Sequence, residues 1–221
     1  MAVLRLLFPP KCPFCGKLLG EGESLLCEAC EKELPYTGSH WKTTGSFFRL
    51  CASPLLYRDK ARQAMLRFKF YGRTAYAACF GKLMADCVEA HLTGDFDLVT
   101  WVPLEALRFH RRGYSQTRLL AMHLAARLGL PAWRLLRKRR RTAAQSTLQG
   151  SARRKANISG AFRLRKGTKA EGLRILLVDD VVTTGATLSE CARVLLTEGA
   201  REVCCVTLCR ALTGTKQKEQ K

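Results

Sequence analysis

The sequence contains no apolar run that approaches the about 20 residues a membrane-spanning helix needs. Its apolar start, residues 3–8, is interrupted by Arg5 and ends at Pro9. It also lacks a small-residue cleavage site, so we do not expect a signal peptide. No convincing internal repeat is visible in the main body of the chain. These absences argue against a transmembrane or secreted protein, and we expect a cytoplasmic one.

Acidic residues are scarce, since 18 Asp and Glu stand against 38 Lys and Arg and give a formal net charge of +20. Such a surplus implies anionic partners: phosphates, pyrophosphate or nucleic acid. The hydrophobic content of 47% is ordinary for a folded soluble protein. A chain of 221 residues supports one sizeable core and a small additional module.

Two C-x-x-C pairs near the start of the chain, Cys12 with Cys15 and Cys27 with Cys30, predict a zinc site. The residues between the pairs suffice for a small hairpin that brings the four thiolates together, as tetrahedral zinc requires. The metal would supply folding energy to a module too small to bury enough apolar surface alone. The alternatives are a redox-active C-x-x-C or a disulfide. No conspicuous His or carboxylate accompanies the thiols, so we expect a structural, closed site.

The other seven cysteines lie in apolar segments without regular spacing. We expect them to be buried free thiols, which fits a reducing cytosol. They are Cys51, Cys79, Cys87, Cys191, Cys204, Cys205 and Cys209.

Residues 175–188, Ile-Leu-Leu-Val-Asp-Asp-Val-Val-Thr-Thr-Gly-Ala-Thr-Leu, are the most informative stretch of the chain. Residues 175–178 predict a central strand of a parallel sheet that is covered on both faces. Asp179 and Asp180 follow at its carboxyl end, where open α/β sheets bind ligands. Residues 183–187 predict a loop that leads into a helix amino terminus, which favours an anion. Because the two acids suit a ribose diol or its magnesium, the stretch predicts a site for a phosphorylated ribose.

This stretch resembles the phosphoribosyl-diphosphate (PRPP) motif of type I phosphoribosyltransferases. The resemblance implies that Asp179 and Asp180 hold the ribose hydroxyls and that the loop holds the 5′-phosphate. The loop residues are Thr183, Thr184, Gly185, Ala186 and Thr187. The alternative is a buried strand followed by a helix with an Asp-rich cap. Every position of residues 175–188 agrees with the PRPP motif. The match is therefore more specific than a lone G-x-G-x-x-G, which recurs by accident.

Three basic segments supply further candidate ligands for anions. Lys69 precedes a glycine in a predicted loop between helices, where it would bind pyrophosphate oxygens or remain a solvated lysine. Arg108 and Arg112 lie in a segment that could close over the site, or that forms a solvated or nucleic-acid-binding loop. Residues 137–141 form a separate basic run, which is either a solvated face or a track for a polyanion.

Strands alternate with helices along the rest of the chain, which predicts an α/β fold with a parallel sheet flanked by helices. The expected strands are 50–57, 97–102, 133–136, 175–178 and 202–209. The expected helices are 59–70, 74–92, 115–128 with Ser115 as a cap, and one that ends near residue 196. Residues 39–46 are a polar junction. We expect a zinc ribbon over residues 1–45, a phosphoribosyltransferase-like domain over 46–213 and a disordered basic tail over 214–221.

Together these motifs resemble the ComF family of bacterial competence-associated, phosphoribosyltransferase-like proteins, over about residues 8–210. The matching elements are the C-x-x-C pairs, Phe68-Lys69-Phe70-Tyr71-Gly72, Val102-Pro103-Leu104 with Arg108, Arg112-Gly113-Tyr114 with Gln116, Gln145 to Leu148 with Arg154 and Asn157, and Asp179 to Thr187. Trp101, where an aliphatic residue is more usual, and Tyr114-Ser115, where Phe-Asn is common, depart from the pattern. Neither departure removes a proposed phosphate ligand.

Two functions from different classes are open. In the first, the chain binds PRPP with Mg²⁺ and transfers the phosphoribosyl group to an unidentified acceptor, and Lys69, Arg108 and Arg112 stabilise the departing pyrophosphate. In the second, it binds single-stranded DNA as an accessory of the competence machinery, and its PRPP site is vestigial or regulatory. Glutamine-dependent amide transfer is not expected, because the related enzymes use an amino-terminal Cys and this chain begins Met1-Ala2.

Overall fold

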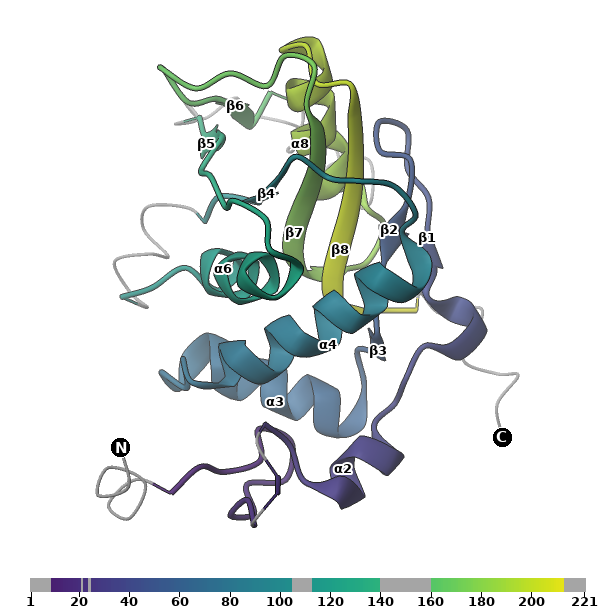
Figure 1. Ribbon diagram of the computed structural model, residues 1–221, viewed down its shortest axis with the longest axis vertical. Helices are drawn as coiled ribbons and strands as arrows, with labels where there is room; N and C mark the ends of the chain where they lie inside the picture. The colour runs from purple at the N-terminus through teal and green to yellow at the C-terminus, as the bar shows by residue number, and fades with distance from the viewer. Residues whose placement is uncertain (1–8, 21, 24, 105–112, 140–159, 213–221) are drawn as a thin grey trace, which may run out of the picture.

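A parallel sheet forms the centre of the computed structural model, which describes residues 9–20, 22–23, 25–104, 113–139 and 160–212 (Figure 1). The strand order is β1-β2-β8-β7-β4, and β3 also pairs with β8. Every pair is parallel except β1 with β2. The bounds are β1 Lys42–Thr43, β2 Cys51–Ala52, β3 Leu55–Leu56, β4 Leu98–Trp101, β7 Arg174–Val182 and β8 Glu202–Arg210. The predicted parallel sheet is thus confirmed.

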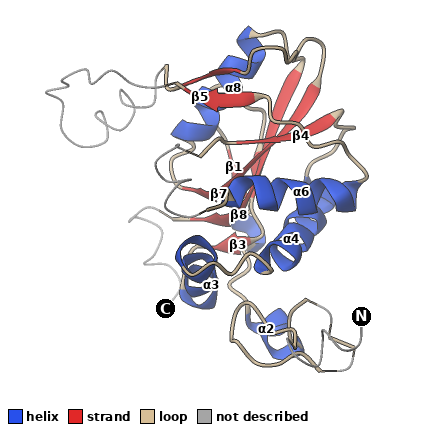
Figure 2. Ribbon diagram, turned by 90° about the vertical axis from the view of Figure 1, so that its left-hand side faces the viewer, coloured by secondary structure: helices blue, strands red, loops and turns tan. Residues whose placement is uncertain are grey.

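Helices cover both faces of this sheet (Figure 2). The helices are α2 Glu28–Glu33, α3 Asp59–Phe70, α4 Tyr76–His91, α6 Gln116–Leu128 and α8 Ala186–Thr197. Alternate residues of β7 point to opposite faces, so Leu176 and Val178 join the core cluster of α4 and α6, and Ile175 and Leu177 join that of α8. This arrangement explains why residues 175–178 are apolar without a polar alternation. None of the helices that the structure describes is long and apolar enough to cross a membrane.

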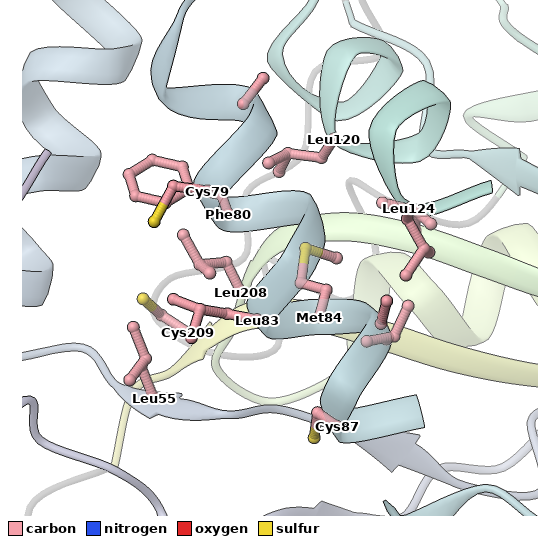
Figure 3. Packing of buried hydrophobic residues seen from close by; sticks show 14 of the residues in the cluster. Leu55, Cys79, Phe80, Leu83, Met84, Cys87, Leu120, Leu124, Leu208 and Cys209 are labelled. Carbon is pink, nitrogen blue, oxygen red and sulfur yellow. The ribbon is translucent and has the colours of Figure 1, made fainter. Parts of the chain in front are cut away.

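Helices α4 and α6 pack tightly in the larger core cluster (Figure 3). Phe80 of α4 lies in this cluster with Leu120 and Leu124 of α6. Gly81 permits the close approach, because a Cβ at this position would lie 2.6 Å from Cβ of His123. The seven cysteines outside the C-x-x-C pairs are buried and free, as predicted.

The cysteine-bearing N-terminal segment packs against the helices of the main body. Its Phe14 is 1% exposed and belongs to the same core cluster as the buried residues of α3 and α4. Figure 1 shows α2 beside α3, and Lys60 of α3 pairs with Glu33 of α2 at 2.6 Å. The segment therefore gains apolar burial from the main core in addition to any metal.

Several strands differ from the prediction. Residues 50–57 form two short strands, because Pro54 between them has no N–H to donate to the ladder. The predicted strand at 133–136 is shifted to β5 (Leu136–Lys138), which pairs with β6 (Phe162–Leu164) in a separate antiparallel sheet. Strands β1 and β6 were not predicted, since two or three residues carry no readable period.

Candidate active site and metal centre

Strand β7 continues to Val182 instead of ending at residue 178, so both acids lie within it. The prediction of a shorter strand was wrong because parallel pairing with β8 persists, with Asp179 opposite Thr207. Neighbouring strand residues point to opposite faces. Asp179 therefore follows Leu177 on the α8 side, and Asp180 follows Val178 on the side of α4 and α6. The side chains of the two acids therefore lie on opposite faces of the sheet, near the carboxyl end of β7.

Asp180 makes an ion pair with Lys69. Its Oδ1 lies 2.8 Å from Nζ of Lys69, and each side chain is 18% exposed. Lys69 lies in the last turn of α3, inside the predicted helix 59–70 and just before the loop at Gly72, so a helix sets the position of its backbone. The segment that enters α6 supports this turn: the Tyr114 hydroxyl donates to O of Phe68, and Nε2 of Gln116 lies 3.5 Å from O of Lys69.

The surroundings of Asp179 disfavour the charged form of its carboxyl. Burial, and then the negative charge of Asp180, raise the pKa of Asp179 to about 8. Its Oδ1 accepts a hydrogen bond of 2.8 Å from N of Asp180. The carboxyl therefore holds its proton to a higher pH than an ordinary Asp, and a bound cation would favour its ionised form.

The loop after β7 leads into α8, as predicted. Thr183 and Thr184 are exposed, whereas Gly185 is buried with a φ of 74°. The helix begins at Ala186, followed by Thr187, and no side chain in the part of the chain that the structure describes caps its amino terminus. Backbone N–H groups in its first turn consequently lack the partner that a Ser or Asp cap provides, which is the arrangement that binds phosphate in other proteins.

Residues of the β1–β2 connection support this loop, and the sequence did not reveal them. A Cβ at Gly185 would lie 3.4 Å from Cζ of Phe48. Gly45 approaches so closely that a Cβ there would lie 2.3 Å from the Phe48 ring and 2.7 Å from Oγ of Ser189. Thr43 borders the same loop, and its buried hydroxyl finds no hydrogen-bond partner among the described residues. The sequence offered one signal for them, the aromatic pair Phe47-Phe48 directly after the polar junction of residues 39–46.

Other predicted ligands lie outside the described residues. Arg108 and Arg112 lie within the segment 105–112, and residues 140 and 141 of the basic run lie within the segment 140–159. The first three residues of that run, 137–139, are described, and Arg137 and Lys138 belong to β5. The roles proposed for them rest on the sequence.

The four cysteines of the C-x-x-C pairs, Cys12, Cys15, Cys27 and Cys30, come together as predicted. Their Sγ atoms all lie within 4.8 Å of one another. Sγ of Cys15 and Sγ of Cys27 are 3.6 Å apart, close to the roughly 3.8 Å expected for two sulfurs at about 2.3 Å from a tetrahedral zinc. All four are free, which argues against a disulfide.

The electrostatics of this cluster also fit a metal. Burial favours the neutral thiol of Cys12, but hydrogen bonds from backbone N–H groups, first that of Cys27, lower its pKa to about 7. Burial and the neighbouring thiols raise the pKa of Cys30. Four thiols so close together can all ionise only around a cation, and a set of four sulfurs suits Zn²⁺.

Comparisons with known proteins agree with both parts of the chain. Residues 3–59 match the double zinc ribbon domain, and residues 115–221 match the phosphoribosyl transferase domain. The DNA utilization protein YhgH of Salmonella typhi is 36% identical over 91% of this chain and 84% of its own length. The competence protein ComFC of Bacillus subtilis (strain 168) is 31% identical over 90% of this chain and 78% of its own.

Solved structures are more distant. The glutamine PRPP amidotransferase from B. subtilis, complexed with ADP and GMP, aligns with 64% of this chain and 30% of its own at 21% identity and a TM-score of 0.43. A TM-score of that size is too low to assign a family. The curated relatives, in contrast, are similar over most of their length. The chain therefore belongs to the ComF family, with a type I phosphoribosyltransferase-like fold and a zinc ribbon at its amino-terminal side.

Proposed function

We propose that this protein binds PRPP and transfers its phosphoribosyl group to an acceptor, with release of pyrophosphate. The observation that carries the proposal is the meeting of three features at one end of β7: the two acids, the ion-paired Lys69 and the uncapped amino terminus of α8. Carboxylates suit ribose hydroxyls, whereas N–H groups and an amine suit phosphate oxygens. The site therefore offers each part of PRPP a partner of fitting chemistry.

Within this proposal, Asp179 and Asp180 orient the ribose, and residues 183–187 hold the 5′-phosphate. Carboxylate oxygens are also ligands that Mg²⁺ prefers, and Mg²⁺ would neutralise charge on the pyrophosphate. Lys69, which pairs with Asp180 in the absence of ligand, would then bind the pyrophosphate. Arg108 and Arg112 complete the positive charge around the leaving group.

Catalysis would then consist of positioning and charge stabilisation. The bond between C1 of the ribose and the pyrophosphate oxygen breaks first, and positive charge develops at C1. The acceptor attacks C1 and forms the new bond, while the bonding electrons leave with pyrophosphate. The basic residues stabilise the negative charge that gathers there.

Titration calorimetry with PRPP, with and without Mg²⁺, tests the binding step. We expect saturable binding that depends on Mg²⁺. Incubation with PRPP and a panel of nucleobases and amines, followed by pyrophosphate measurement, tests the transfer. If the protein binds PRPP but releases no pyrophosphate with any acceptor, it is a PRPP sensor and not an enzyme. If it does not bind PRPP, the proposal is refuted.

A second function, single-stranded DNA binding during DNA uptake, has its own support. The net charge of +20 suits a polyanion, and relatives carry the names DNA utilization protein and competence protein. Aromatic side chains that can stack on bases are exposed, with Trp133 at 55% and Tyr71 at 71%. Under this second function the protein is a cytoplasmic partner of the competence machinery. Its PRPP site is then either regulatory or vestigial.

Mutations of the two basic segments should separate these functions. Replacing Arg108 and Arg112 by Ala is expected to weaken PRPP or pyrophosphate binding and to change DNA binding little. Replacing Arg139, Arg140 and Arg141 by Ala is expected to weaken oligonucleotide binding and to flatten its salt slope by roughly one unit per lost phosphate contact. Equal losses of both ligands in both variants would instead mean one shared anion surface.

A further inference from the structure

The loop of the first C-x-x-C pair contacts the helix that carries Lys69. Arg67 of α3 donates from Nη2 to the carbonyl oxygens of Pro13 and Phe14, at 2.9 and 2.8 Å. Both carbonyls lie between Cys12 and Cys15 in the chain, so a metal bound by these cysteines fixes their positions. Hydrogen bonds from a guanidinium are stronger than those between neutral groups.

Aromatic packing forms a second connection between the same parts. The Phe14 ring lies 5.7 Å from that of Phe80, and Phe80 lies 5.4 Å from Phe68 in an edge-on contact. Phe68 is fully buried, and its ring lies 6.2 Å from that of Tyr114, whose hydroxyl donates to the Phe68 carbonyl. The path thus continues from the cysteine loop to the segment that enters α6.

These two connections flank Lys69 in the last turn of α3. Arg67 and Phe68 immediately precede it, and the turn closes with a 3.0 Å hydrogen bond from N of Tyr71 to O of Arg67. End turns of helices fray unless tertiary contacts hold them. A lysine is flexible, so its reach to Asp180 depends on a fixed backbone.

We infer that zinc at the four cysteines positions Lys69 for the proposed phosphate site through Arg67 and Phe14. The zinc ribbon then contributes to ligand binding at that site by holding Lys69 in place. Arg67 is then a positioning residue that itself touches no substrate. The inference rests on the proposed function only where ligand affinity is concerned, since the order of the α3 end is measurable without any ligand. Linkage also requires that PRPP tighten zinc binding by the same factor by which zinc tightens PRPP binding.

Hydrogen exchange of the zinc-loaded protein tests the inference directly, with the variants Arg67→Met and Lys60→Met. Each methionine keeps an apolar stem, and each variant removes one link between α3 and the N-terminal segment. Lys60 is the matched control, because its 2.6 Å pair with Glu33 lies at the opposite end of the same helix. Arg67→Met is expected to speed amide exchange at residues 68–71 by about tenfold, within the 5–150-fold range usual for coupled sites. Lys60→Met should leave those amides unchanged, and both variants should keep one zinc per chain.

PRPP affinity supplies the second readout. We expect Arg67→Met to raise the dissociation constant of PRPP by about tenfold, Arg67→Lys to recover part of the loss and Lys60→Met to match the wild type. Unchanged exchange at residues 68–71 in zinc-loaded Arg67→Met would overturn the inference. If wild-type protein binds no PRPP, the proposed function fails, and exchange alone still decides whether Arg67 transmits the order of the zinc ribbon to Lys69.

Discussion

Replacing Asp179 and Asp180 together by Asn is expected to abolish PRPP binding and to leave the protein folded. With Mg²⁺ bound, both carboxyls would be ionised, and each lost carboxylate then removes a charge-assisted hydrogen bond to a ribose hydroxyl, worth about 1.5 kcal/mol or more, so affinity should fall at least about a hundredfold. The fold should persist because the pKa of Asp179 is raised to about 8. Burial thus already favours its neutral form, and a neutral amide of the same shape replaces it. Calorimetry with PRPP and circular dichroism measure the two effects.

Asp97→Asn is the matched control for this variant. Asp97 accepts a 2.6 Å hydrogen bond from N of Arg174 at the beginning of β7, at the end of the strand opposite to the two acids. The control also removes a carboxylate at β7, and we expect its PRPP affinity to equal that of the wild type. Wild-type affinity in the folded double variant would contradict the ribose assignment.

Removal of zinc should affect the whole protein and not only its amino-terminal part. Purified protein is expected to hold one zinc per chain, and Cys12→Ser combined with Cys27→Ser is expected to lose it. Because Phe14 shares the core cluster of α3 and α4, the free energy of unfolding should fall by more than about 4 kcal/mol, as for other losses of a structural metal. Metal analysis and thermal unfolding, with and without a chelator, measure both quantities.

Cys87→Ala is the control for the thiol itself. Cys87 is buried in α4 and lies outside the four-cysteine cluster, so the variant should keep its full zinc content. A Cys12→Ser, Cys27→Ser protein with full zinc and wild-type stability would show that the four thiols are not the metal ligands.

The sequence predicted those elements whose side chains show a clear period or cap. Helix α3 has the predicted bounds of residues 59 and 70, and Ser115 caps α6 by accepting from N of Arg118. The buried strands β7 and β8 were located correctly because apolar, β-branched runs are typical of a sheet covered on both faces. The four-cysteine cluster was predictable for another reason, since C-x-x-C spacing itself brings two thiols into one turn.

The contacts that complete the candidate site depend on residues far apart in the chain. The pair of Lys69 with Asp180 joins positions separated by more than a hundred residues, and only the packing of α3 beside the sheet brings them together. Phe48 supports Gly185 across a similar separation. The strand length at Asp179 was also missed, because the carboxyl interrupts the apolar run while backbone pairing with β8 continues. Hydropathy reports burial, and it does not report where a ladder of hydrogen bonds ends.

The position of β8 has a consequence for how this protein is made. β8 lies between β7 and β2 and also pairs with β3, although it is the last described strand in the chain. During synthesis, strands from residues 51–56 and from residues 174–182 therefore emerge long before the strand that joins them. Until residues 202–210 leave the ribosome, the sheet remains in two parts with apolar edges and free thiols exposed. Folding must then close contacts across some 150 residues, the kind of long-range parallel pairing that is slow and prone to aggregation.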